Sequence, residues 1–103
     1  MATKTYGGVT VDITDEGYMT NMDQWSPEIA RAIAKGEGID LTDSHMKVLE
    51  FLRDRQKKGE ALSIRSIQKS GIIDVKLFYQ LFPGAPLKKS TKIAGIPKPT
   101  SCV

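Results

Sequence analysis

The feature that most limits the fold of this chain is the repeated interruption of its apolar segments by glycine and by residues that begin helices. The sequence has 103 residues, among them nine glycines and five prolines. Glycine supplies the positive φ angles of tight turns and helix ends, while serine, threonine and aspartate favour the position just before a helix. We therefore expect short elements only, in a chain long enough for one compact domain.

The first of these elements is a predicted β-hairpin over residues 4–13. Gly7 and Gly8 match the two-residue turn of a hairpin, and the segment Val9–Ile13 alternates apolar and polar side chains as a half-buried strand does. A two-stranded hairpin is not stable by itself in water. We therefore expect it to pack against helices.

The rest of the chain up to residue 89 has the pattern of short helices. Four starts are expected at capping residues: Ser26, Thr42 or Asp43, Ser63 and Asp74. Glycines at positions 36, 38, 59, 71 and 84 are expected to end these helices or follow their ends. The buried side of the fourth helix is expected to consist of Val75, Leu77, Phe78 and Leu81. A further short helix is predicted over residues 85–89, so the chain is mainly helical.

The C-terminal segment differs from everything before it. Residues 93–103 contain two prolines and a glycine and show no helical period. Proline removes a backbone donor and favours extended conformations. We therefore expect residues 1–92 to form the helical domain and residues 93–103 to form a mobile arm, with a hinge at Gly95 and stiffening by Pro97 and Pro99.

One cysteine, Cys102, stands next to last in the chain. A single thiol cannot form an intramolecular disulfide, and together with the one histidine, His45, it cannot supply the roughly four ligands of a closed zinc site. We expect no metal and no cofactor, and we expect His45 to cap or pack a helix. A thiolate at an exposed chain end can attack the sulfur of a persulfide. We interpret Cys102 as such a nucleophile, the alternative being an incidental terminal cysteine.

Charge is distributed unevenly along the chain, whose net charge is +3. Up to Asp54 there are five basic and ten acidic residues, and from Arg55 onward ten basic and two acidic. The basic half favours an acidic partner, or forms a solvated face. The residues expected to dock a partner are Lys88, Lys89, Lys92 and Lys98. Binding of nucleic acid through Arg65, Lys69 and Lys76 is less favoured, because phosphate contacts alone give no sequence specificity.

Neither a membrane span nor a secretory signal is expected. No apolar run approaches the roughly 20 residues that cross a bilayer, and the first five residues lack the apolar stretch of a signal peptide. We expect a cytoplasmic protein that does not insert into membranes and is a monomer when alone.

Four blocks of the sequence together carry a resemblance to a known family. The blocks are Asp15–Tyr18 with Trp25, Leu41–His45 with Phe51–Arg53, Leu81–Gly84 with Pro86, and Lys92–Val103. They resemble the family of DsrC, the gamma subunit of dissimilatory sulfite reductase, and TusE, a relay protein of tRNA 2-thiolation. The resemblance covers nearly the whole chain, and its C-terminal block is the most specific. It implies a small orthogonal helical bundle with a helix-turn-helix-like element, an N-terminal β-hairpin and a flexible C-terminal arm.

The resemblance also implies a function. Cys102 would accept persulfide sulfur from a donor protein and pass it to an acceptor, with sulfite reductase or a Tus-type relay complex as partners. The alternative is a non-catalytic subunit or regulator that binds sulfite reductase or DNA.

The chain departs from the family pattern at several positions. Thr91 stands where DsrC has a second cysteine, so an intramolecular disulfide is excluded here. Ser101 replaces the usual glycine beside the cysteine, Met46 replaces a usual tryptophan, and the segment after Gly59 is shortened.

Overall fold

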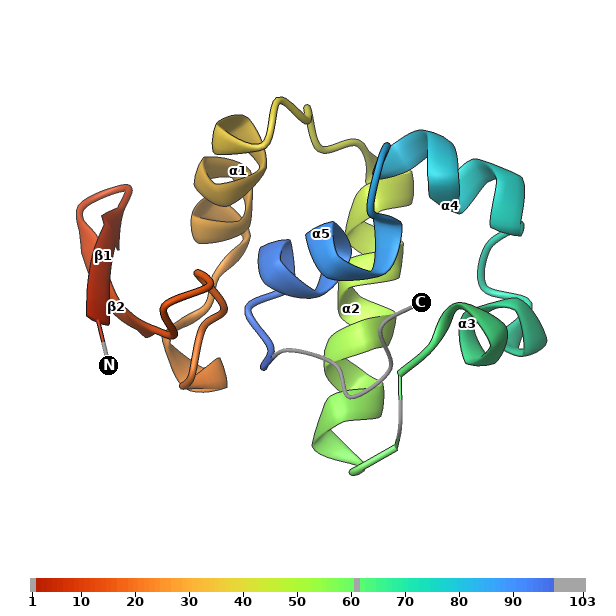
Figure 1. Ribbon diagram of the computed structural model, residues 1–103, viewed down its shortest axis with the longest axis horizontal. Coiled ribbons are helices and arrows are strands. Elements are labelled where there is room, and N and C mark those ends of the chain that lie inside the picture. The colour runs from red at the N-terminus through yellow and green to blue at the C-terminus, as the bar shows by residue number, and fades with distance from the viewer. Residues whose placement is uncertain (1, 61, 98–103) are drawn as a thin grey trace.

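A computed structural model describes residues 2–60 and 62–97 of the chain. In this part, five α-helices and a short 3-10 helix accompany a two-stranded antiparallel sheet. The elements are β1 (Ala2–Tyr6), β2 (Val9–Ile13), η1 (Met22–Gln24), α1 (Pro27–Gly36), α2 (Asp43–Lys57), α3 (Ile64–Ser70), α4 (Val75–Leu81) and α5 (Pro86–Ile93). Figure 1 shows the hairpin at one end of the molecule, α3 and α4 at the other, and α2 and α5 between them. The mainly helical fold with an N-terminal hairpin is confirmed.

The hairpin has the turn that the sequence predicts. Tyr6 pairs with Val9 across the turn, and Gly7 and Gly8 have φ angles of 55° and 84°. Positive φ at both turn positions matches the right-handed twist of the flanking strands. Val11 is fully buried against the helices, whereas β1 is mostly exposed. The hairpin therefore covers one side of α1 and begins two residues earlier than predicted.

Capping residues begin the helices where the sequence predicts. The Ser26 Oγ accepts a hydrogen bond from the amide of Ile29 at 3.3 Å, and the Ser63 Oγ accepts one from the amide of Ser66 at 3.1 Å. Thr42 is the residue before α2, and Asp74 is the residue before α4. A helix start leaves its first backbone amides unpaired. The hydroxyls of Ser26 and Ser63 accept hydrogen bonds from such amides.

The buried side of α4 is narrower than predicted. Phe78 is the one buried residue of this helix, and its ring packs edge-on to Phe82 with centroids 5.7 Å apart. Leu77 was expected on the same side but is 39% exposed. Leu81 of the same helix is partly buried and packs against the core. A helix of only seven residues has two turns, so two side chains provide its contact with the core.

The last helix, α5, is longer than predicted. It ends at Ile93, four residues beyond the predicted end at residue 89. Ser90 and Thr91 are fully buried, and their hydroxyls lie 3.1 and 2.8 Å from the carbonyl oxygen of Leu87. Because these hydroxyls donate back to the helix, two polar residues occupy core positions without unpaired groups.

The core lies between α1, α2 and α5 and receives apolar side chains from the other elements. Its largest fully buried members are Phe78, Phe82, Met19, Leu49, Leu52, Ile67, Ile93 and Ile96. Among the helices of residues 2–60 and 62–97, none combines the length and apolar character that a bilayer span requires.

Candidate functional site

The predicted site falls partly within the described residues. Cys102, Lys98 and Pro99 lie outside them, so their roles stay predictions. The structure does describe the chain up to Pro97, which is exposed. The described part of the site is therefore the end of α5 and the chain that leaves it.

The end of α5 has a regular backbone geometry. The Gly95 amide donates to the carbonyl of Lys92 at 3.2 Å, and the Ile96 amide donates to the carbonyl of Thr91 at 3.3 Å. Gly95 has a φ of 68°. This pair of bonds around a left-handed residue is the Schellman motif, which closes the carbonyl end of a helix.

Two side chains from distant segments bind the next carbonyls. The Trp25 Nε1 donates to the carbonyl oxygen of Ile93 at 2.8 Å. The Arg53 Nη1 donates to the carbonyl oxygen of Ala94 at 2.9 Å, while its Nη2 donates to that of Met22 at 2.9 Å. The Arg53 guanidinium also stacks over the Trp25 ring, with Cζ 4.3 Å from the ring centroid. The end of α5 is thereby tied to α2 and to the segment around η1.

Gly95, the expected hinge, lies beneath the tryptophan. A Cβ atom on this residue would lie 2.3 Å from Cδ1 of Trp25 and 2.9 Å from Sδ of Met19. Ile96, which follows, is fully buried. The residues from Ile93 to Ile96, which we expected to belong to the arm, thus pack with the helical domain in the described structure. Their mobility stays a prediction.

The Arg53 guanidinium is partly removed from water. Burial lowers the pKa of Arg53 below its ordinary value, and the negative charge of Asp23 opposes that shift. Arginine remains protonated in proteins despite such shifts. Arg53 therefore stays a cation and keeps donating to both carbonyls.

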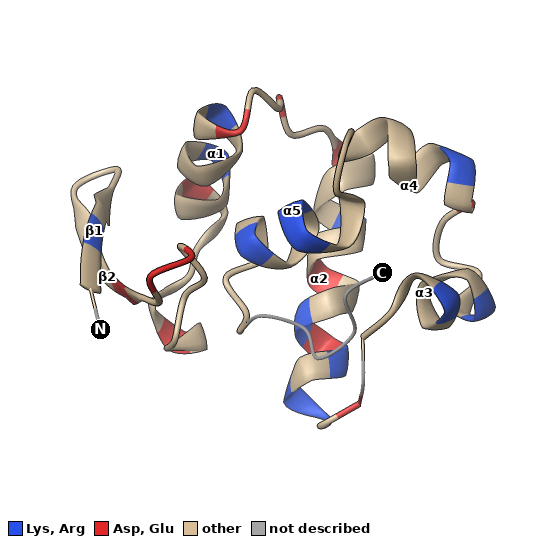
Figure 2. Cartoon of the chain, viewed as in Figure 1, with Lys and Arg blue, Asp and Glu red and all other residues tan. Residues whose placement is uncertain are grey.

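The predicted docking lysines have different surroundings. Lys88 is exposed, whereas the Nζ of Lys92 lies 3.7 Å from a carboxylate oxygen of Glu37 and 5.4 Å from the centroid of the Tyr18 ring. Lys88 also borders a hollow of about 230 Å³ between α4 and α5, whose other lining residues include Ile64, Tyr79, Pro86 and Leu87. Figure 2 shows basic residues on α3, α4 and α5 and acidic ones near the turn after β2. Of the predicted docking lysines that the structure describes, Lys88 is exposed, whereas Lys89 and Lys92 are partly buried.

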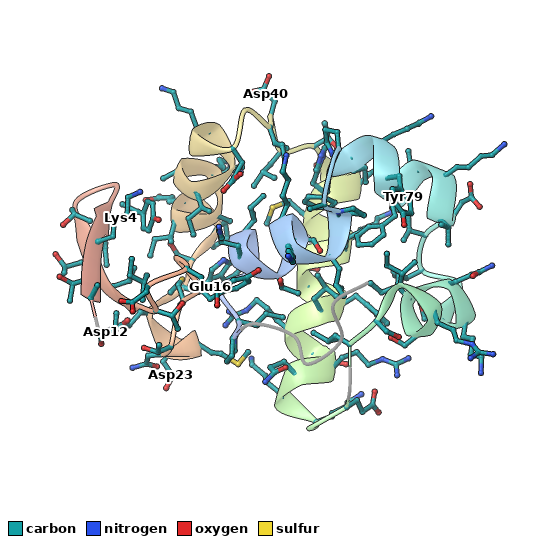
Figure 3. All side chains as sticks on the ribbon, in the orientation of Figure 1. Lys4, Asp12, Glu16, Asp23, Asp40 and Tyr79 are labelled. Carbon is teal, nitrogen blue, oxygen red and sulfur yellow. The ribbon has the colours of Figure 1, made fainter. Side chains whose placement is uncertain are left out.

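A larger groove of about 480 Å³ lies between the hairpin, α1 and α5. Side chains of both charges line it, including Lys4, Lys92, Glu16 and Glu37. Figure 3 labels Lys4 and Glu16, on the side of the hairpin that faces the helices. With Asp15 the lining contains three acidic and two basic side chains, so the charges of the groove largely offset one another and leave a small acidic excess.

The side chain at position 91, where DsrC has a second cysteine, is not accessible to solvent. Thr91 is fully buried, and its hydroxyl bonds within α5. The described residues also contain no group of three or more histidine, cysteine or acidic side chains able to hold a metal ion.

His45 caps and packs as expected. Its Nδ1 accepts a hydrogen bond from the Thr42 amide at 3.0 Å, which assigns the ring proton to Nε2. The Nε2 donates to the carbonyl oxygen of Leu81 at 2.9 Å. His45 therefore joins the start of α2 to the end of α4.

Sequence reasoning missed the joint role of two residues. The sequence predicts Trp25 as a core anchor and Arg53 as one of the charged residues on the solvent side of its helix, and neither prediction includes a contact with α5. Both fall inside the blocks that carry the family resemblance, and this was the available signal. Their partners are 68 and 41 positions away, so no local pattern could reveal the contacts.

Comparisons with known proteins agree with this fold. Residues 5–103 match the model of a family described as DsrC like protein. The chain is 39% identical over 105 residues to the dissimilatory-type sulfite reductase subunit gamma of Nitratidesulfovibrio vulgaris, with 100% of both chains covered. It is 35% identical over 106 residues to the sulfurtransferase TusE of Escherichia coli, with 95% of this chain and 97% of that protein covered. The crystal structure of the oxidized DsrC gamma-subunit from Archaeoglobus fulgidus aligns with a TM-score of 0.81 at 32% identity, covering 99% of this chain and 100% of that one.

Proposed function

Because the chain belongs to the DsrC family, we propose that it is a sulfur carrier that holds sulfur on Cys102 and passes it between partner proteins. The observation that carries the proposal is the penultimate position of the lone cysteine in a chain that matches the family over residues 5–103. The name of the E. coli relative, sulfurtransferase TusE, supports sulfur transfer as the chemistry.

The proposed step is a displacement at sulfur. The Cys102 thiolate attacks the outer sulfur of a donor persulfide, and a new S–S bond forms as the S–S bond of the donor breaks. The donor leaves as a thiolate with the bonding electron pair, and Cys102 becomes a persulfide. Delivery repeats the step with an acceptor thiolate, so no outside oxidant or reductant is needed.

The surroundings of Thr91 support a carrier with one thiol. Its hydroxyl is buried and bonded within α5, so position 91 offers no second group for sulfur chemistry. We propose that sulfur is held as a persulfide on Cys102 and is not bridged between two positions of the chain.

The test is mass spectrometry of the full chain after incubation with a sulfurtransferase charged from cysteine. We expect a gain of one sulfur atom, about 32 Da, that maps to Cys102 and is removed by a thiol reductant. A Cys102→Ser variant serves as the control and should gain nothing. Absence of the adduct, or an equal adduct on the variant, would contradict the proposal.

The two named relatives suggest two classes of partner. One is a subunit of dissimilatory sulfite reductase and the other a TusE sulfurtransferase. Lys88, which is exposed beside this hollow, supports docking to an acidic protein surface in either case. Co-purification with a sulfite reductase or with a Tus-type complex, measured for the wild type and for Lys88→Glu, separates the two classes.

Regulation by DNA binding is the second candidate. Arg65, Lys69 and Lys76 are exposed on α3 and α4, the predicted helix-turn-helix-like pair. Exposed apolar residues on the same pair, Leu77 and Tyr79, suit a protein surface better than phosphates. A gel shift that persists in Cys102→Ser would favour DNA binding over sulfur transfer.

A further inference from the structure

The end of α5 differs from the two other helix ends that have the same backbone geometry. α1 and α2 also close with Schellman bonds around a glycine, Gly38 and Gly59, each with a φ of 74°. A Cβ atom on either would meet nothing within 4 Å. On Gly95 it would meet Trp25 at 2.3 Å. Only the helix that leads to the C-terminal segment has its end covered in this way among these three.

The three helix ends also differ in the number of hydrogen bonds that their last carbonyls accept. The closing carbonyls of α1 and α2 receive backbone amides of nearby residues. The end of α5 has the same backbone bonds. In addition, the Trp25 indole donates to the carbonyl of Ile93, and the Arg53 guanidinium donates to the carbonyl of Ala94. A helix does not need both sets in order to end, since water can satisfy exposed carbonyls. The additional donors therefore indicate a requirement for a fixed position at this point.

We propose that Trp25, Arg53 and Gly95 form an arm-root clamp, a set of positioning residues that fixes where the chain departs toward Cys102. This inference rests on the proposed function, because it treats Cys102 as the acting group. It also moves the pivot that we expected from the sequence. The clamp holds Gly95 and Ile96 in place, so the pivot lies beyond Ile96.

The clamp limits the reach of the thiol. Cys102 lies five positions after Pro97, so the two Cα atoms can be at most about 18 Å apart even in a fully extended chain. A pivot at Gly95 would allow two residues more. Restricting the thiol to a smaller volume about a fixed point raises its effective concentration at a partner docked on the domain.

The chain contains its own pair of probes for this test. Trp25 is the only tryptophan and Cys102 the only cysteine, so energy transfer from Trp25 to a dansyl acceptor on Cys102 reports the position of the thiol relative to the clamp. In the wild type we expect the time-resolved decay to give a distribution of distances limited by the reach of the segment beyond Pro97. Donor-only samples of every variant correct for changes in tryptophan lifetime.

Arg53→Lys is the main variant. A lysine keeps the charge but cannot bind two carbonyls in a fixed fork, so we expect the distance distribution to broaden and shift to longer distances. The matched control is Arg55→Lys on the same helix. Arg55 stacks on Phe51 and pairs with Glu60, and it makes no bond to α5. The control should leave the distribution unchanged.

Gly95→Ala disturbs the clamp at the glycine beneath Trp25, where the added methyl group would clash with the ring. Gly59→Ala is its control, because Gly59 has a similar φ but no atom within 4 Å of an added Cβ. We expect broadening in the first and none in the second. If Gly95→Ala does not fold by circular dichroism, Arg53→Lys decides. If the distance distribution of Arg53→Lys, and that of Gly95→Ala where it folds, equals that of the wild type, the clamp proposal is wrong.

The rate at which Cys102 is loaded with sulfur distinguishes a positioning role of Arg53 from a role in stability alone. Loading of Cys102 by the protein sulfurtransferase should slow about tenfold in Arg53→Lys, since small misplacements of reacting groups have effects of this size. Loading by inorganic polysulfide, which needs no docking, should keep its wild-type rate. Equal slowing of both reactions would overturn the positioning role. The distance measurement requires no sulfur transfer, so a missing persulfide would refute the proposed function and leave the clamp standing.

Discussion

The end of α5 receives two long-range side-chain hydrogen bonds, whereas the α3–α4 pair receives one, from His45 to Leu81. At the end of α5, side chains 68 and 41 positions away donate to the last carbonyls. In the described chain, the side-chain hydrogen bonds of α3 join residues no more than three positions apart, such as Ser63 with Ser66. Local bonds shape a helix, whereas long-range bonds and packing fix its position relative to the rest of the molecule. The α3–α4 pair depends for its position on apolar packing and on His45.

The surfaces of these two regions differ as well. Ile96 is fully buried at the end of α5. The α3–α4 region contains three of the exposed large apolar side chains, Ile72, Leu77 and Tyr79, which are 39–46% exposed. Tyr79 can be located in Figure 3 on the α4 side of the molecule. The comparison predicts that substitutions at the end of α5 destabilise the protein much more than substitutions of the exposed apolar residues in the α3–α4 pair.

The largest effect is expected for Gly95→Ala. The added methyl group would lie 2.3 Å from Trp25 in a residue whose φ is 68°, so overpacking and left-handed strain add together. We expect a loss of at least about 3 kcal/mol in the free energy of unfolding. Gly59→Ala places an alanine in the same left-handed conformation but without a close contact. Its free energy of unfolding should fall by only about 1 kcal/mol. Urea denaturation measures both, and equal losses would break the comparison.

An intermediate effect is expected at the link between α2 and α4. His45→Ala leaves the Leu81 carbonyl and the Thr42 amide without their partner, which should cost about 2 kcal/mol in the free energy of unfolding. His45→Gln can restore the cap at Thr42 and should lose about half as much. Amide hydrogen exchange should show the extra opening in α4 while α5 keeps its protection. Equal exchange in both helices would mean that His45 does not position α4.

The smallest effect is expected for Leu77→Ser. Because Leu77 is 39% exposed, the free energy of unfolding should change by no more than about 0.5 kcal/mol. The neighbouring Phe78→Ala removes a fully buried ring and should cost about 3–5 kcal/mol. Thermal or urea denaturation distinguishes the two. A large loss in Leu77→Ser would restore the sequence-based expectation that this side chain is buried.

Local chemistry accounts for what the sequence predicts well. Ser26 and Ser63 are strong caps because a hydroxyl beside its own backbone meets the first amides of a helix whatever the rest of the chain does. The Gly7-Gly8 turn is predictable for a similar reason, since few residues adopt positive φ twice in succession. These signals need no knowledge of tertiary contacts.

Tertiary contacts explain what the sequence could not show. The continuation of α5 to Ile93 was missed because Ser90 and Thr91 hide the apolar period, and only their bonds to Leu87 allow them to be buried. Leu77 was misplaced because a pattern cannot tell which residue of a two-turn helix meets the core. The contacts of Arg53 depend on where α5 ends in space.

The attachment of the last described residues has a mechanical consequence. If a partner draws on the C-terminal segment, the tension enters the domain at Ile96 and passes through the Arg53 guanidinium into the middle of α2 and through the Trp25 indole toward η1. Several bonds across different elements then share the load, so α5 does not unravel turn by turn from its free end. Forced unfolding by a handle at the C-terminus should accordingly proceed in one step, without an earlier event for α5 alone.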